Sequence, residues 1–164
     1  MPPAARITDP VAHPLPPVLT GGPTAVTVII GYIPAWRGIG AAAAASLQSA
    51  KASSDAAIKT AEAATIAAAG TPGAPAAKAA EEATKAAAAA SMGSMISSAA
   101  AGTDIHVCAT LLPVPPHGPG VVITPSQTVI IAGMPAARMG DTILEAVGPP
   151  NTITKGEPTV LIGE

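Results

Sequence analysis

The chain has 164 residues with no Phe, one Trp and one Tyr, so it cannot fill a large core with aromatic side chains. Its formal net charge of −2 excludes a basic nucleic-acid-binding surface, and its single cysteine, Cys108, excludes an internal disulfide framework. The first residues, Met-Pro-Pro-Ala-Ala-Arg, lack the apolar stretch of a secretory signal. We therefore expect a protein made in the cytoplasm and exported, if at all, by a route without a signal peptide.

Composition divides the chain into a discontinuous β domain and a helical insert. Residues 1–40 and 102–164 are rich in Pro, Gly, Thr, Val and Ile, which favours short strands and tight turns. Residues 41–101 are dominated by Ala, the strongest helix former. The sequence Gly-Thr-Pro-Gly at 70–73 interrupts this insert, since Gly ends helices and Pro cannot continue one. The insert is predicted to form an antiparallel hairpin of two helices over about 41–69 and 75–99.

The two flanking parts contain an internal repeat of a β-branched segment followed by a Gly turn and Pro-Ala. One copy begins with Thr-Val-Ile-Ile at 27–30, and a second, 101 residues later, begins with the same four residues at 128–131. A third begins at Thr159, 31 residues further on, and the chain ends before it is complete. The N-terminal Pro-Ala-Ala-Arg at 3–6 supplies the missing half. Three such units, closed across the joined ends, predict a mainly β, pseudo-threefold body with a thin core.

The three histidines and the cysteine are the candidate metal ligands. In an extended strand, His106 and Cys108 point to the same face because they are two residues apart. The stiff turn Pro-Pro-His-Gly-Pro around His117 can return to that face, and His13 lies outside any strand pattern. Three imidazoles and one thiolate complete the tetrahedral set of a structural zinc site. From the residues alone, the alternative of unrelated polar side chains around a small buried cysteine stays open.

Other chemistry is sparse. The aspartates Asp9, Asp104 and Asp141 are interpreted as turn residues, because Asp accepts hydrogen bonds from nearby backbone amides. Arg6 and Arg138 are expected to tie their own turns to a neighbouring carboxylate or carbonyl. No nucleophile elbow and no phosphate-binding loop is present. We expect no catalytic residues and no enzymatic activity.

The sequence Met-Pro-Ala-Ala-Arg-Met-Gly-Asp at 134–141 resembles the signature of the PAAR-repeat proteins, and Pro-Ala-Ala-Arg occurs again at 3–6. The ending from Gly148 to Gly163 is also similar to the family's C-terminal repeat. The resemblance implies a pseudo-threefold β cone that caps the trimeric spike of a contractile injection machine, chiefly type VI secretion. It further implies one structural Zn²⁺ at the apex, and matches the family's ligand positions to His13, His106, Cys108 and His117.

The resemblance also implies the partners. One monomer would cap a trimeric VgrG-like spike protein and leave the cell with it. It would touch a membrane only on delivery, and we expect no nucleic-acid partner. The helical insert would be a place for an effector or a chaperone to attach.

Three features depart from the family pattern. Trp36 replaces an Ala in the first copy, which also lacks its following Asp. The helical insert interrupts the fold after this copy. The stretch at 143–147 lacks the Cys or polar residues often found there.

Two other functions remain as alternatives. A small metallohydrolase could use the same ligands with an open coordination position. A membrane-interacting protein could act through the Ala-rich segment 41–103.

Overall fold

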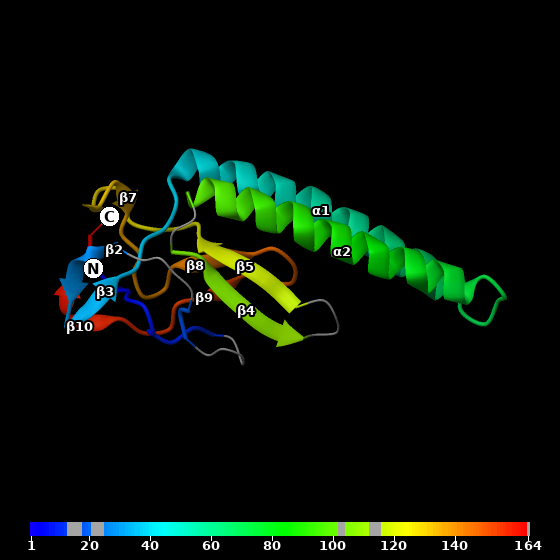
Figure 1. The fold of residues 1–164 in the computed structure, drawn as a ribbon, viewed down its shortest axis with the longest axis horizontal. Coiled ribbons are helices and arrows are strands. Elements are labelled where there is room, and N and C mark those ends of the chain that lie inside the picture. Colours follow the sequence, from blue (N-terminus) through cyan, green and yellow to red (C-terminus); the bar gives the residue numbers. More distant parts are fainter. Residues whose placement is uncertain (13–17, 21–24, 102–103, 112–115, 164) are drawn as a thin grey trace.

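The computed structural model describes residues 1–12, 18–20, 25–101, 104–111 and 116–163. His13 lies outside these residues. Two long antiparallel helices lie along one side of a body built from short antiparallel strands (Figure 1). The two ends of the chain lie near each other, at the end of the body that carries β2, β3 and β10. The prediction of a mainly β fold with a helical insertion is confirmed.

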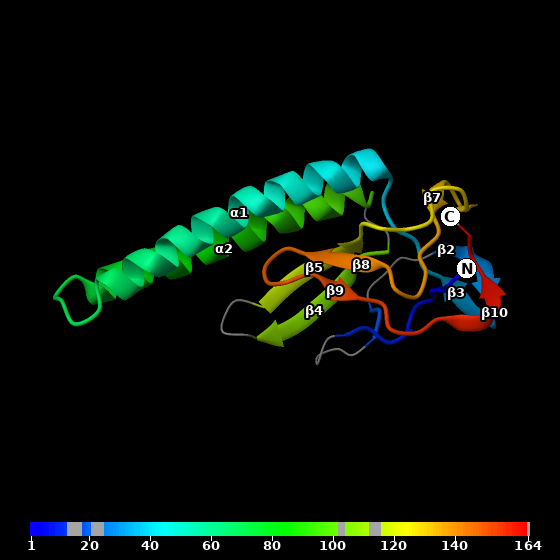
Figure 2. The same ribbon diagram turned by 180° about the vertical axis from the view of Figure 1, so that it is seen from behind.

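The helices are α1, Ala41–Ala67, and α2, Ala74–Ala99. Gly70, in the connection between them, has φ +76°, a backbone conformation that favours glycine. Pro75 lies in the first turn of α2, where its missing N–H costs no hydrogen bond. The predicted antiparallel helical hairpin is confirmed (Figure 2). Helix α1 ends at Ala67, two residues earlier than expected.

The strands are short, and most belong to two-stranded pairs. Their bounds are β1 Pro3–Ala4, β2 Ala25–Ile30, β3 Ile33–Ala35, β4 His106–Leu111, β5 Pro116–Val122, β6 Ile130–Ile131, β7 Met134–Pro135, β8 Thr142–Glu145, β9 Asn151–Thr152 and β10 Glu157–Leu161. One four-stranded antiparallel sheet has the order β4-β5-β8-β9. The three remaining pairs are β2-β3, β6-β7 and β1-β10.

These three pairs are the three repeat copies. The pair β1-β10 joins the two ends of the chain, with Pro3 opposite Leu161, as the circular repeat predicted. The copies are linked by a closed ring of backbone hydrogen bonds. Ala5 N–H donates to Ala137 O (2.9 Å), Ala137 N–H to Trp36 O (3.0 Å), and Trp36 N–H to Ala5 O (2.8 Å). Each copy thus donates one of these hydrogen bonds and accepts another. The conical shape stays a prediction.

Equivalent residues of the three copies also pack together in two layers. One layer consists of Ala4, Ala35 and Ala136 with Ile30, Ile131 and Ile162. The next contains Ala5, Trp36 and Ala137, surrounded by larger aliphatic side chains. Trp36 stands where the family pattern has an Ala, and its side chain is fully buried, so the larger side chain fills the core of this layer. A body with few aromatics therefore closes around small residues whose backbones approach closely.

An arginine and an aspartate close the turn that follows each copy. The Asp9 carboxylate accepts hydrogen bonds from the backbone and side chain of Arg6, and Asp141 does the same for Arg138. The expectation that these residues stabilise their own turns is confirmed.

In the first copy the turn is split by the insert. The guanidinium of Arg37 binds the Asp104 carboxylate at 2.5 Å, although 67 residues separate them. The sequence interpretation that this copy lacks its Asp is therefore wrong. Asp104 supplies it from beyond the hairpin, which interrupts the motif between its Arg and its Asp.

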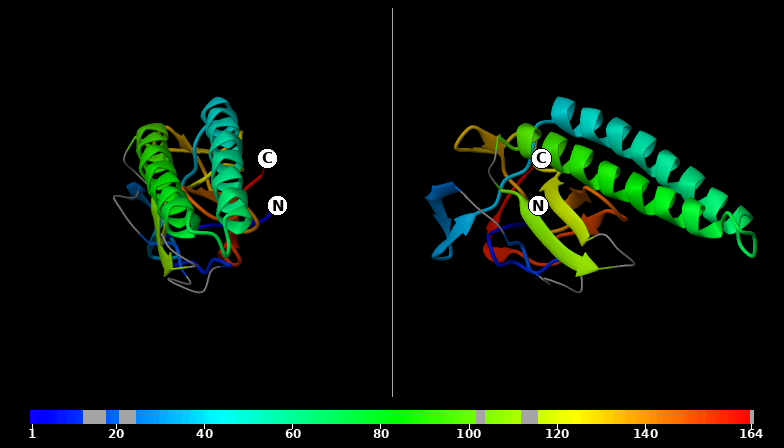
Figure 3. Two further views of the ribbon diagram at one scale, coloured as in Figure 1. Left: turned by 90° about the vertical axis from the view of Figure 1, so that its right-hand side faces the viewer. Right: turned by 45° about the vertical axis from the view of Figure 1, so that its right-hand side comes forward.

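The base of the hairpin packs on the β body. Leu47 of α1 and Met92 and Ile96 of α2 are buried in one cluster with residues of β5 and β8, including Val121 and Leu144. A side chain at Gly93 would come within 3.2 Å of Pro119, so glycine allows α2 to lie close against β5. The far half of the hairpin extends past the strands (Figure 3). The insert therefore both packs against the body and projects from it.

Candidate metal centre

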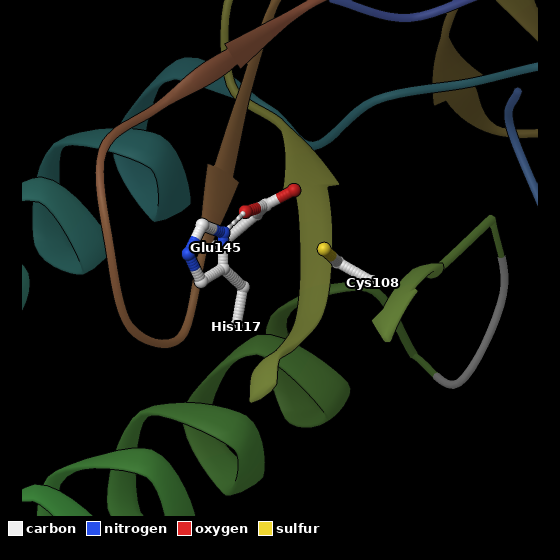
Figure 4. Close-up of side chains that lie close together, drawn as sticks. All are labelled: Cys108, His117 and Glu145. Atoms are coloured by element: carbon white, nitrogen blue, oxygen red, sulfur yellow. Dashed lines mark hydrogen bonds and ion pairs between the residues drawn. The ribbon is translucent and has the colours of Figure 1, made fainter. Parts of the chain in front are cut away.

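The four-stranded sheet brings together three side chains that could hold a metal ion. Cys108 of β4 pairs with Gly118 of β5, and Glu145 of β8 pairs with Gly120 of β5. The donor atoms of Cys108, His117 and Glu145 all lie within 4.8 Å of one another, and all three residues are buried. Figure 4 shows these side chains converging from three adjacent strands.

His106 and Cys108 share the inner face of β4, as their spacing predicted. Each is 1% exposed, whereas Val107 between them is 51% exposed. His106 Nε2 lies 3.8 Å from Glu145 Oε1, and its Nδ1 accepts a hydrogen bond from the Thr20 backbone at 3.4 Å. His106 thus lies beside the three-residue group, in contact with its carboxylate.

His117 and Glu145 form a close buried pair. His117 Nδ1 lies 2.7 Å from Glu145 Oε2, and the Asn151 amide lies 3.5 Å from Glu145 Oε1. Glu145 is fully buried, a costly position for a carboxylate unless positive charge or hydrogen bonds compensate it. The same carboxylate can orient an imidazole that binds a metal, or bind the metal itself.

Sequence reasoning missed Glu145. The stretch 143–147 was described only as lacking the Cys or polar residues often found there, but the structure places its single acidic residue, Glu145, beside Cys108 and His117. The signal was a single acidic residue within an otherwise apolar strand, Ile-Leu-Glu-Ala-Val. Such a residue is seldom buried without a partner.

Two glycines make room for this pair. A Cβ at Gly148 would lie 2.7 Å from His117 Nε2, and one at Gly120 would lie 3.0 Å from Glu145 Cγ. Gly148 also has φ +87°, in the region that side chains disfavour. The loop after β8 and the centre of β5 therefore both depend on glycine to hold His117 and Glu145 where they are.

The donor types suit zinc, which binds thiolate, imidazole and carboxylate ligands. Bond lengths of about 2.0–2.3 Å place the ligand atoms of a tetrahedral zinc roughly 3.3–3.8 Å apart. The donor atoms of the group lie within 4.8 Å of one another, and His117 Nδ1 and Glu145 Oε2, at 2.7 Å, are closer together than two zinc ligands, so the side chains would have to adjust around an ion. The structure places Cys108 and His117 together with His106 nearby. The full set with His13 stays a prediction.

The comparisons with known proteins identify one family. Residues 112–164 match the family model of the PAAR motif. The chain carries a PAAR motif. The resemblance noted in the sequence is confirmed over these residues, which include His117 and Glu145. No curated protein and no solved structure matches the chain.

The hairpin was the basis of the alternative membrane function. Within the described residues, neither α1 nor α2 is apolar enough over its length to cross a membrane.

Proposed function

We propose that this PAAR protein is a non-enzymatic tip that caps the trimeric spike of a contractile injection machine of the type VI secretion kind. The observation that carries the proposal is the threefold pattern of contacts among the repeat copies. A single chain whose three copies form a closed hydrogen-bonded ring can present nearly the same surface in three directions. Such a monomer matches the symmetry of a trimer without forming an oligomer itself.

The proposed docking face lies at the end formed by β2, β6 and β10. The equivalent residues Ile29, Ile130 and Leu161 are 53%, 56% and 51% exposed. These three apolar side chains, one from each copy, are exposed to the same degree, so they repeat with the threefold pattern and suit an apolar contact with a threefold partner. Strands at this end also offer backbone groups to the β-helix of a VgrG-like spike.

A bound zinc would stiffen the opposite end of the body. An ion held by Cys108 and His117 would cross-link β4 and β5, the first two strands after the insert. Structural zinc contributes on the order of 10 kcal/mol of apparent binding energy. The projecting half of the hairpin is the proposed attachment place for an effector or chaperone.

The test is capture of the protein by its trimeric spike protein, with both chains purified. Replacing Ile29, Ile130 or Leu161 by Asp should each weaken capture at least tenfold, because each would bury a charge in an apolar interface. Ile66→Asp is the matched control, since Ile66 is 75% exposed but lies on the hairpin. Capture that is unchanged by all three substitutions would overturn the proposed docking face.

A further inference from the structure

We propose that Glu145 is a direct metal ligand in this chain, completing a site with His106, Cys108 and His117 that does not require His13. The inference rests on the metal centre of the proposed function. All four proposed ligands come from neighbouring strands of one sheet, β4, β5 and β8. The set implied by the resemblance instead includes His13 from the N-terminal segment.

Geometry supports this assignment first. Glu145 is one of the three residues whose donor atoms already lie within 4.8 Å of one another. The Oε1 atom of Glu145 lies 3.8 Å from His106 Nε2, a separation expected between two ligand atoms of a tetrahedral zinc. One carboxylate therefore contacts both imidazoles, His106 through Oε1 and His117 through Oε2.

Charge supports it second. A dication bound by three imidazoles and one thiolate keeps a net charge of about +1, whereas a thiolate and a carboxylate together neutralise it. Neutrality favours binding where the surroundings exclude water, and Glu145 and His106 are at most 1% exposed. The ion in turn supplies the positive charge that a fully buried carboxylate requires.

The experiment uses the full chain, stripped of metal by a chelator and titrated with Co²⁺. Cobalt bound to a thiolate gives a near-ultraviolet charge-transfer band whose intensity counts the sulfur ligands. Glu145→Cys keeps the negative charge and adds a thiolate, so we expect the band to rise roughly twofold at one cobalt per chain. Leu144→Cys is the matched control, because Leu144 packs toward the hairpin on the other face of β8.

Two further variants separate the candidate ligands. Glu145→Gln should weaken cobalt binding tenfold or more, while His13→Ala should change it less than threefold. A Glu145→Cys band at the intensity of one thiolate, loss of binding in His13→Ala, or no cobalt binding by the wild-type chain would each overturn the proposal. Far-ultraviolet circular dichroism checks that the variants fold. A chain that binds cobalt as expected but is not captured by the spike fails the proposed function alone.

Discussion

The ion pair that closes the split motif gives the most demanding prediction. Arg37 and Asp104 lie 2.5 Å apart, with side chains only 7% and 1% exposed. Asp104→Ala removes the carboxylate and leaves the Arg37 guanidinium buried, although it still donates to Ala132 O at 3.4 Å. Breaking a buried pair from one side costs about 3–5 kcal/mol. For a chain of this size, that lowers Tm by roughly 6–20 °C.

The assay is urea and thermal unfolding of the protein, with every variant measured at the same added zinc concentration. The control is Asp55→Ala, which removes the 40%-exposed partner of Lys51 and should cost less than about 1 kcal/mol. The double variant Arg37→Met with Asp104→Leu should recover the part of the loss that comes from the unpaired charge, because an apolar pair buries no charge, while the positive φ of residue 104 (+52°) disfavours both Ala and Leu there. The reasoning is refuted if Asp104→Ala costs no more than Asp55→Ala, or if the double variant is as unstable as the sum of its single changes.

Three further predictions concern the core, the metal centre and the hairpin. Trp36→Ala introduces the residue that the other two copies have at this position. Because Trp36 is fully buried, the change should nevertheless lower the free energy of unfolding by about 3–5 kcal/mol. A loss below about 1 kcal/mol in urea unfolding would contradict this. Gly148→Ala should weaken Co²⁺ binding, because the added methyl group would push on His117. Gly70→Ala is the control: Gly70 also has a positive φ but lies in open space, so this change should lower stability slightly and leave Co²⁺ binding unchanged. Equal Co²⁺ binding by both variants would refute the role of Gly148. Hydrogen bonds from Lys85 and Lys78 lower the pKa of Glu81 to about 2 from its usual 4.5, so its contribution to stability is complete above pH 4.5 and is lost as the pH falls toward 2. The Tm difference between wild type and Glu81→Gln should therefore shrink over that interval, and a difference independent of pH would contradict it.

The amino-acid sequence by itself determined the local elements and their repetition. Ala-rich stretches form helices through intrinsic propensity, and Gly70 with Pro72 interrupts them, so the hairpin follows from nearest neighbours. The repeat at fixed offsets also predicted that the segments forming β1 and β10 pair, and the structure confirms this pairing. The alternation that buries His106 and Cys108 around Val107 is equally local.

Only the tertiary structure decided which distant residues meet. Asp104 completes the turn of Arg37 across the whole insert, and no local pattern connects residues so far apart. Glu145 joins Cys108 and His117 because β5 pairs with both β4 and β8, and strand partners depend on the closed fold. The base of the hairpin lies against β5 since Leu47, Met92 and Ile96 bury apolar area there, a long-range gain that helix propensity does not encode.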